Sequence, residues 1–313
     1  MVEIDKEIGW MSSEGISKVK LFYSAVIALL LSLQIGCAGF RGKQYHHFET
    51  QTALKGDQTL ILGFLGGLER WDDESRGVRK LATKINSWKL SNVHIETLEN
   101  RKSDLAIKFI RNTFDHDQNG FLDDRERNSA RLILYGHSLG GAAVVEVSRE
   151  LKKMGVPILL TVQIDSVDLI YGDHIIPSNV KRAANLFQND GWLLRGEDKI
   201  EPENPDKTEI IANIRFDYRT KNIDMSSLSW ERRLFSLPHT KMDADPEVWA
   251  RVEQMILSEL VDNTDQIFAR DKSLSIPPAL GGKVSPHQQE RRNGKCLIAM
   301  QDVISEGCQS KGS

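Results

Sequence analysis

The chain has 313 residues, of which 40% are hydrophobic and 27% are charged, so it can bury a sizeable core without help from metals or disulfides. Its formal net charge is −3 at pH 7, and it contains no block of basic residues and no internal repeat. This charge balance argues against a general electrostatic attraction to nucleic acid. We therefore expect a globular protein with no nucleic-acid partner.

The N-terminus has the pattern of an export signal. Lys18 and Lys20 precede a stretch from residue 21 to residue 40 that carries no charge and is strongly apolar over residues 25–31. A basic flank, an apolar run and then small residues are typical of a secretory signal peptide. We expect residues 1–36 to be that signal. The alternative is an uncleaved membrane anchor, because about 20 uncharged residues are just long enough to span a bilayer.

The end of this signal carries a cysteine. Residues 34–38 are Gln-Ile-Gly-Cys-Ala and resemble the bacterial lipobox, in which the cysteine is lipidated and begins the mature chain. The resemblance implies export to the bacterial cell envelope, either with a lipid anchor on Cys37 or as a periplasmic or secreted protein. In an oxidising compartment the two remaining cysteines, Cys296 and Cys308, either form a disulfide or stay as free thiols.

Apolar periodicity divides residues 58–268 into alternating strands and helices. Strands are predicted at 59–63, 92–97, 132–135, 157–164, 181–187 and 210–218, and helices at 75–88, 104–114, 139–154 and 245–260. Strands that alternate with helices form parallel units whose helices cover both faces of the sheet. The predicted fold class is therefore α/β, with a doubly wound, mostly parallel sheet. We interpret residues 37–57 as a linker or edge segment, 197–207 as an excursion or lid, and 269–313 as a peripheral tail.

A glycine-rich hexapeptide follows the third predicted strand and opens the next helix. Residues 136–141 are Gly-His-Ser-Leu-Gly-Gly. Glycines two places before and after Ser138 allow the sharp turn that presents a nucleophilic hydroxyl above the edge of a sheet. The helix N-terminus and the backbone N–H of Leu139 would then face an oxyanion formed at that serine. The alternative is a purely structural turn with a buried serine.

This turn resembles the nucleophile elbow of the α/β-hydrolase superfamily, especially its lipases and esterases, over roughly residues 58–260. The resemblance implies a serine hydrolase that cleaves a carboxylic ester or related acyl bond, in a small-molecule or lipid substrate, through an acyl-enzyme. It also implies a second oxyanion donor in the turn after an earlier strand, where residues 62–67 are Leu-Gly-Phe-Leu-Gly-Gly. That donor would be the N–H of Phe64, or of Leu65.

A nucleophilic serine needs a base to take its proton and an acid to orient the base. The resemblance implies the chain order serine, acid, histidine. Among the eight histidines, His239 has the matching place, in an expected loop between the last predicted strand and the last helix. The predicted acid is Asp165, which ends the fourth strand. Asp190, one strand later, and Asp168 are the alternatives.

Residues 115–126 match the EF-hand calcium loop at every informative position, with Gly120 at the sharp turn and Leu122 at the apolar position. The predicted Ca²⁺ ligands are the side chains of Asp115, Asp117, Asn119, Asp123 and Glu126 and the carbonyl of Phe121. Five residues of strand, at about 3.3 Å each, would separate this loop from Ser138, so the ion would lie on the order of 16 Å from the nucleophile. We expect calcium to be structural. The alternative is a solvated acidic loop.

Two other functions stay open at this point. The same three residues could cleave a thioester or transfer an acyl group to another alcohol, because lid and pocket residues choose the leaving group and the acceptor. Alternatively, the chain is a calcium-stabilised surface lipoprotein that uses an inactive hydrolase scaffold for binding.

Overall fold

The computed structural model describes residues 42–49, 53–54, 58–168, 172–191, 195–226, 228 and 237–271. The expected signal peptide with Cys37, and the Cys296 and Cys308 pair, lie outside the described residues. Side chains are described as far as Leu260. Within this part of the chain, no helix combines the length and the apolar character that a membrane span requires.

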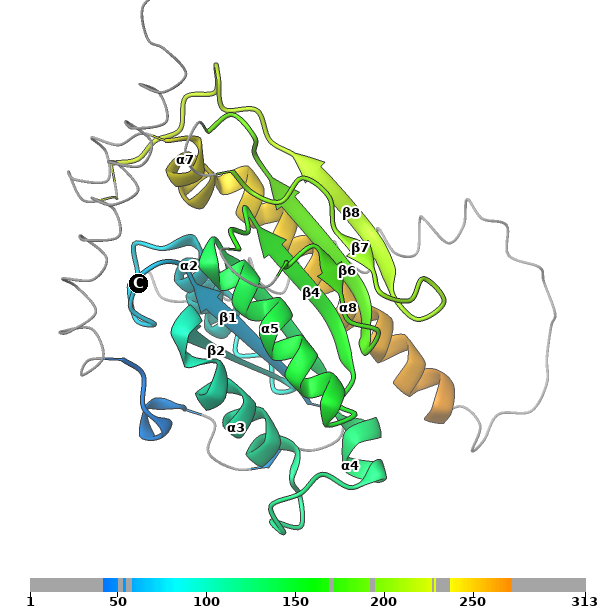
Figure 1. The fold of residues 1–313 in the computed structure, drawn as a ribbon. Helices are drawn as coiled ribbons and strands as arrows, with labels where there is room; N and C mark the ends of the chain where they lie inside the picture. The colour runs from blue at the N-terminus through cyan, green and yellow to red at the C-terminus, as the bar shows by residue number, and fades with distance from the viewer. Residues whose placement is uncertain are drawn as a thin grey trace, which may run out of the picture.

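A six-stranded sheet, in which all neighbouring strands are parallel, forms the centre of the molecule (Figure 1). In spatial order its strands are β2 (Val93–Glu99), β1 (Thr59–Leu65), β3 (Leu132–His137), β4 (Ile158–Ile164), β6 (Val180–Phe187) and β8 (Glu209–Arg215). The chain adds β2 on one side of β1 and every later strand on the other side. The order therefore reverses between β1 and β3, and doubly wound sheets bind ligands at the carboxyl ends of the strands at such a point.

Helices cover both faces of this sheet. The pair α3 (Ser103–Phe114) and α5 (Leu139–Lys153) packs on one face, and the pair α2 (Gly77–Ser87) and α8 (Pro246–Asp271) packs on the other (Figure 1). Successive side chains of a strand point to opposite faces, so each central strand contributes to two cores. Leu60 and Leu62 of β1 pack under α3 and α5, and Ile61 packs under α2 and α8.

Central and edge strands of the sheet differ in how their residues are buried. All seven residues of β1 are buried, as expected for a continuous apolar run between two neighbours. The edge strand β8 instead alternates between exposed and half-buried residues. The α/β class with a doubly wound parallel sheet, which the apolar periodicity predicted, is confirmed.

The shorter elements connect this framework. They are the 3-10 helices η1 (Tyr45–His47) and η2 (Asn100–Lys102), the helices α4 (Asp124–Ser129) and α7 (Pro238–Ala244), and the two-stranded sheet of β5 (Ile175–Ile176) and β7 (Glu201–Pro202). The segment interpreted as an excursion, 197–207, thus contributes one strand of that small sheet.

One element differs from expectation at the predicted base. His239 lies in α7, where a loop was expected. Pro238 occupies the first turn of α7, a position that suits proline because its missing N–H would have no partner in the helix. The periodicity analysis missed this helix because seven residues make only two turns, too few for an apolar repeat to emerge.

Candidate functional site

Ser138 lies in a strained turn between β3 and α5. Its backbone has φ 58° and ψ −129°, a combination that residues other than glycine seldom adopt. The turn is so tight that a Cβ at Gly136 would lie 2.2 Å from the carbonyl oxygen of Gly140. The Ser138 N–H donates to the carbonyl of Ile164, the last residue of β4, at 2.9 Å. The elbow is thereby fixed at the carboxyl end of the central strands.

Three side chains form one hydrogen-bonded chain at this edge of the sheet. The distance between Ser138 Oγ and His239 Nε2 is 2.9 Å, and that between His239 Nδ1 and Asp165 Oδ2 is 2.6 Å. His239 is buried and Asp165 fully so. With a proton on Nδ1 held by the carboxylate, Nε2 is free to accept the proton of the serine hydroxyl.

The surroundings of His239 favour its charged form. Burial lowers the pKa of the imidazole, but the hydrogen bond and charge of Asp165 outweigh it, and the charges of Asp243 and Glu69 add to the effect. The net result is that the pKa of His239 lies above its ordinary value. An imidazolium formed by proton transfer from Ser138 is therefore stabilised where it arises.

The acid is held by the neighbouring strand. The Gln188 side chain donates from Nε2 to Asp165 Oδ2 at 2.9 Å, and the Gln188 N–H donates to Asp165 Oδ1 at 3.2 Å. Gln188 follows β6 directly and is itself fully buried. It therefore fixes the carboxylate that faces His239. No sequence motif pointed to Gln188, because its role arises only when β4 and β6 pair.

The two alternative acids lie elsewhere. Asp190 accepts hydrogen bonds from the Arg215 guanidinium and the Tyr218 N–H, each at 2.8 Å. Asp168 lines a cavity of about 260 Å³ together with Ser166 and other polar residues after β4 and β6. Ser138 is not among the residues that line this cavity. Among the three candidate acids, only Asp165 contacts His239 in the described structure.

The strand that carries Phe64 and Leu65, the expected second oxyanion donors, is longer than predicted. Phe64 is buried inside β1, in register with Leu98 of β2 and Gly136 of β3, and Leu65 is still in the strand. The strand runs two residues beyond its predicted end at Gly63, which moves the turn along the chain. Gly66 now stands opposite the nucleophile, because a Cβ there would lie 2.8 Å from Ser138 Cβ. Gly66, which begins the turn after β1, thus faces Ser138, and its N–H donates to Glu69 Oε2 at 3.1 Å.

Leu139, the other expected donor, follows Ser138 at the start of α5. Leu139 is the first residue of α5, where backbone N–H groups have no partner within the helix. Its N–H and the positive end of the helix dipole are adjacent to Ser138.

Next to the triad lies a buried group of charges, which we call the Arg76 cluster: Glu69, Arg76 and Asp243. The Arg76 guanidinium is 2.8 Å from Glu69 Oε1 and 2.9 Å from Asp243 Oδ2. The three side chains are 11%, 4% and 2% exposed, so solvent screens them little. Burial, together with the charge of Asp243, raises the pKa of Glu69 to about 8, against the opposing effect of Arg76.

His137 is packed against the predicted base. The two imidazole rings stack with centroids 4.8 Å apart. Both ring nitrogens of His137 are buried and have no hydrogen-bond partner among the described residues. Burial lowers the pKa of His137 to about 4, with the charges of His239 and Arg76 acting in the same direction and those of Asp243 and Asp165 opposing them. The ring beside His239 is therefore neutral at pH 7.

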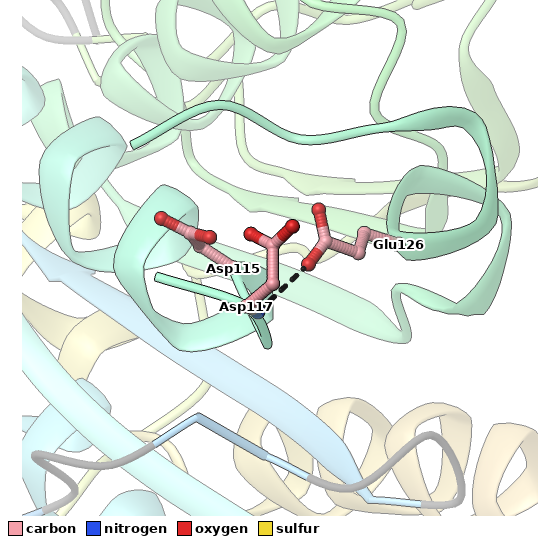
Figure 2. Close-up of side chains that lie close together, drawn as sticks. All are labelled: Asp115, Asp117 and Glu126. Carbon is pink, nitrogen blue, oxygen red and sulfur yellow. Dashed lines mark hydrogen bonds between the residues drawn. The ribbon is translucent and has the colours of Figure 1, made fainter. Parts of the chain in front are cut away.

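The predicted calcium loop connects α3 to α4 at the other end of β3 (Figure 1). Asp115, Asp117 and Glu126 each bring a carboxylate oxygen within 4.8 Å of the other two (Figure 2). Asp115 and Glu126 are about 95% buried, and the three carboxylates lie near one another in Figure 2. Like charges held this close repel unless a cation lies between them.

Backbone groups of the loop hold its other oxygens in place. The Asp115 carboxylate accepts from the N–H of Gly120 at 2.8 Å, where a φ of 87° requires glycine. The Asn119 side-chain oxygen accepts from the Phe121 N–H at 2.8 Å. Asp123 caps α4 by accepting from the Glu126 N–H at 2.8 Å. Each of these oxygens keeps a lone pair for a further contact.

The chain has no counterpart among protein-family models or among curated proteins. Among solved structures it is similar to the dienelactone hydrolase from Anabaena variabilis ATCC 29413, with 10% sequence identity, a TM-score of 0.35 and coverage of 67% of this chain and 88% of that chain. It is also similar to an uncharacterized protein from Pseudomonas aeruginosa, with 11% identity, a TM-score of 0.35 and coverage of 82% of this chain and 60% of that chain. Similarities this distant do not bear on reaction or substrate, so the function has to be inferred from the site itself.

Proposed function

We propose that this protein is a serine hydrolase that cleaves a carboxylic ester or a related acyl bond. The observation that carries the proposal is the hydrogen-bonded chain from Ser138 Oγ through His239 to Asp165, at 2.9 and 2.6 Å, on a strained elbow. These three residues are 101 and 74 positions apart along the chain, so the fold alone brings them together. A serine, a base and an orienting acid in this order of contact define nucleophilic acyl transfer.

The reaction proceeds in two halves. Ser138 Oγ attacks the substrate carbonyl carbon while His239 Nε2 takes the hydroxyl proton, and Asp165 stabilises the imidazolium. The oxyanion accepts a hydrogen bond from the Leu139 N–H at the positive end of α5. Collapse of this intermediate breaks the bond to the leaving alcohol, which takes the proton from His239 and leaves an acyl group on Ser138. Water, deprotonated by His239, then releases the acid and restores the serine.

Turnover of p-nitrophenyl esters of increasing acyl length tests this proposal. Ser138→Ala should reduce kcat by about 10⁴-fold or more, as removal of a triad serine does. Ser87→Ala is the matched control, because Ser87 is exposed near the end of α2 and bonds only to its own helix. Equal activity in Ser138→Ala and the wild type would refute the assignment. Faster turnover of acyl thioesters than of matched esters would indicate a thioesterase. Formation of a new ester with an added alcohol would indicate an acyltransferase.

We also propose that residues 115–126 bind one structural calcium ion. Hard carboxylate, amide and carbonyl oxygens are the donors that Ca²⁺ prefers. Asp115, Asp117, Asn119 and Glu126 would supply side-chain oxygens, Phe121 its carbonyl, and Asp123 a contact through water. An ion there would tie the end of α3 to the start of α4 and so to the strand that carries the elbow. It would neutralise the converging carboxylates and take no part in acyl transfer.

Export is a separate proposal, which rests on residues 18–40 alone. A lipid on Cys37 would hold the protein at the cell envelope, and without it the protein would be periplasmic or secreted. Cys37→Ala should move the protein from the membrane fraction to the soluble fraction and abolish incorporation of labelled palmitate. Unchanged fractionation would exclude lipidation at this cysteine.

A further inference from the structure

Two separate segments must be placed against Ser138 for the proposed reaction. One is the turn at residues 66–67 after β1, and the other is α7, which carries His239. Neither belongs to the parallel sheet. The Arg76 cluster contacts both segments, because Glu69 lies just after the turn and Asp243 lies four residues after His239 in α7.

The contacts of Asp243 fix the base helix. Asp243 Oδ2 accepts from Arg76, and its Oδ1 accepts from the N–H of Gly77, the first residue of α2, at 3.1 Å. The Asp243 carbonyl accepts from the Trp249 indole N–H at 2.7 Å. A helix of only seven residues is marginal in isolation, so tertiary contacts must hold it. Asp243 lies one helical turn after His239 in α7 and provides such a contact.

The contacts of Glu69 fix the turn. Glu69 Oε2 accepts from the N–H of Gly66 at 3.1 Å, and the Gly66 carbonyl accepts from the Glu69 N–H at the same distance. Glu69 Oε1 faces Arg76. The turn is thus closed on itself and attached to the guanidinium, which places Gly66 against the nucleophile. One side chain, Arg76, is the common partner of both segments.

The cluster also bears on the charge of His239. Its two carboxylates share one guanidinium, and the other ionisable groups near His239 are Asp165 from the end of β4 and the neutral His137 from β3. Asp73 lies 3.4 Å from Arg76 at the outer side of the cluster, and Lys241 of α7 reaches the carbonyls of Tyr218 and Lys221. Beyond the effect of Asp165, the charge of Asp243 raises the pKa of His239, and that of Glu69 adds to it only where Glu69 is ionised, above its own pKa of about 8.

We propose that Arg76 is a positioning residue for the acyl-transfer site, which acts through Glu69 and Asp243 to hold the turn at residues 66–67 and the His239 helix against Ser138. The inference rests on the proposed hydrolase function. No sequence motif marks Glu69, Arg76 or Asp243, and the hydrogen bonds and ion pairs described for them reach neither Ser138 Oγ nor the His239 ring.

The test measures kcat, KM and the pH dependence of kcat/KM for one p-nitrophenyl ester. Arg76→Met should reduce kcat by about 10²-fold with a smaller change in KM, because misplacing a catalytic group by about 1 Å costs that much. Arg79→Met is the matched control: Arg79 also belongs to the α2 region and pairs with a glutamate, Glu74, but not with the cluster. It should retain wild-type kcat.

Asp243→Asn separates positioning from mere stability. The base must be neutral to accept the serine proton, so kcat/KM rises through the pKa of His239. Loss of a nearby negative charge lowers this pKa, and the acid limb of the profile should move to lower pH. Because both variants break the same contact, the Arg76→Met and Asp243→Asn double variant should lose little more activity than the worse single variant.

Arg76→Lys keeps the proposal testable if Arg76→Met does not fold. A lysine retains the charge but lacks the planar fork that contacts both carboxylates, so kcat should fall by about 10-fold in a folded protein. Wild-type kcat in Arg76→Lys together with an unmoved acid limb in Asp243→Asn would overturn the inference. If turnover depends on Ser138 but not on Arg76, only this inference fails; if turnover does not depend on Ser138, the proposed function fails with it.

Discussion

Two polar clusters lie at opposite ends of β3 and are built in different ways. The cluster at its carboxyl end joins Ser138, His239 and Asp165 from three elements, over separations of 101 and 74 residues, and is largely buried. The loop at its amino end, residues 115–126, forms most of its hydrogen bonds within itself. Its carboxylates bond to groups no more than 10 residues away along the chain, and nine of its twelve residues are exposed.

The two clusters therefore depend on different parts of the molecule for their order. Strands and helices of the core orient the groups around Ser138, so substitutions there should change the rate more than the fold. The loop has few packing contacts of its own, so its order should depend on a bound cation.

Asp165→Asn should reduce kcat by about 10⁴-fold, because the amide no longer holds the His239 tautomer that accepts the serine proton. Asp190→Asn is the matched control, since Asp190 bonds to Arg215 and Tyr218 instead. Steady-state ester hydrolysis measures both. A larger loss of kcat in Asp190→Asn than in Asp165→Asn would indicate that Asp190 is the acid and would contradict the described contacts.

His137→Phe should make the protein less sensitive to acid. The pKa of His137 is lowered to about 4 in the folded state, mainly by burial, so the unfolded chain binds a proton more readily and stability falls as pH drops from about 6.5 to 4. At pH 5 this costs the wild type about 2 kcal/mol relative to pH 7. Phenylalanine keeps a buried ring without that proton. Denaturant unfolding at both pH values measures the difference, and parallel losses in the two proteins would show that His137 is not the sensitive group.

Calcium removal should lower the free energy of unfolding but leave the chemistry of the triad intact. An ion at 100 times its Kd stabilises the folded state by about 2.7 kcal/mol, and EDTA should therefore lower Tm by several degrees. Glu126→Ala should abolish the response to EDTA while the protein remains folded and active at low temperature. Calorimetry with and without Ca²⁺ is the measurement. Identical melting curves would leave the loop as a solvated acidic turn.

Phe121→Ser should have the smallest effect. The Phe121 side chain is 78% exposed, and its proposed role uses only the backbone carbonyl. Stability and the calcium response should stay within about 0.5 kcal/mol of the wild type. A lost calcium response in this variant would mean that the ring, and not the carbonyl, supports the loop.

The same contrast explains what the sequence could predict. Residues 115–126 form a contiguous motif, so every proposed ligand could be named before the structure. Ser138 could be named from its elbow and His239 from chain order, and the fold class followed from continuous apolar strands. The acid could not be decided among Asp165, Asp168 and Asp190, because the pairing of strands and the contact of Gln188 settle which carboxylate faces the histidine.

Other parts of the site left no readable signal. Gly66, the residue facing Ser138, could not be picked out because β1 was expected to end at Gly63, two residues before its actual end at Leu65. The Arg76 cluster joins residues 167 positions apart, and charged side chains on a linear sequence give no indication that they will be buried together. Asp243 could be related to His239 only after α7 was known to be helical, since the two are one turn apart.

Labelling with a fluorophosphonate, followed by peptide mass spectrometry, tests whether Ser138 is a nucleophile that His239 activates. The reagent reacts with a serine whose proton is taken by a neighbouring base. The account predicts one adduct per chain, located on Ser138, with labelling lost in Ser138→Ala and slowed by orders of magnitude in His239→Ala. An unlabelled wild-type protein, or an adduct that forms equally fast without His239, would contradict it.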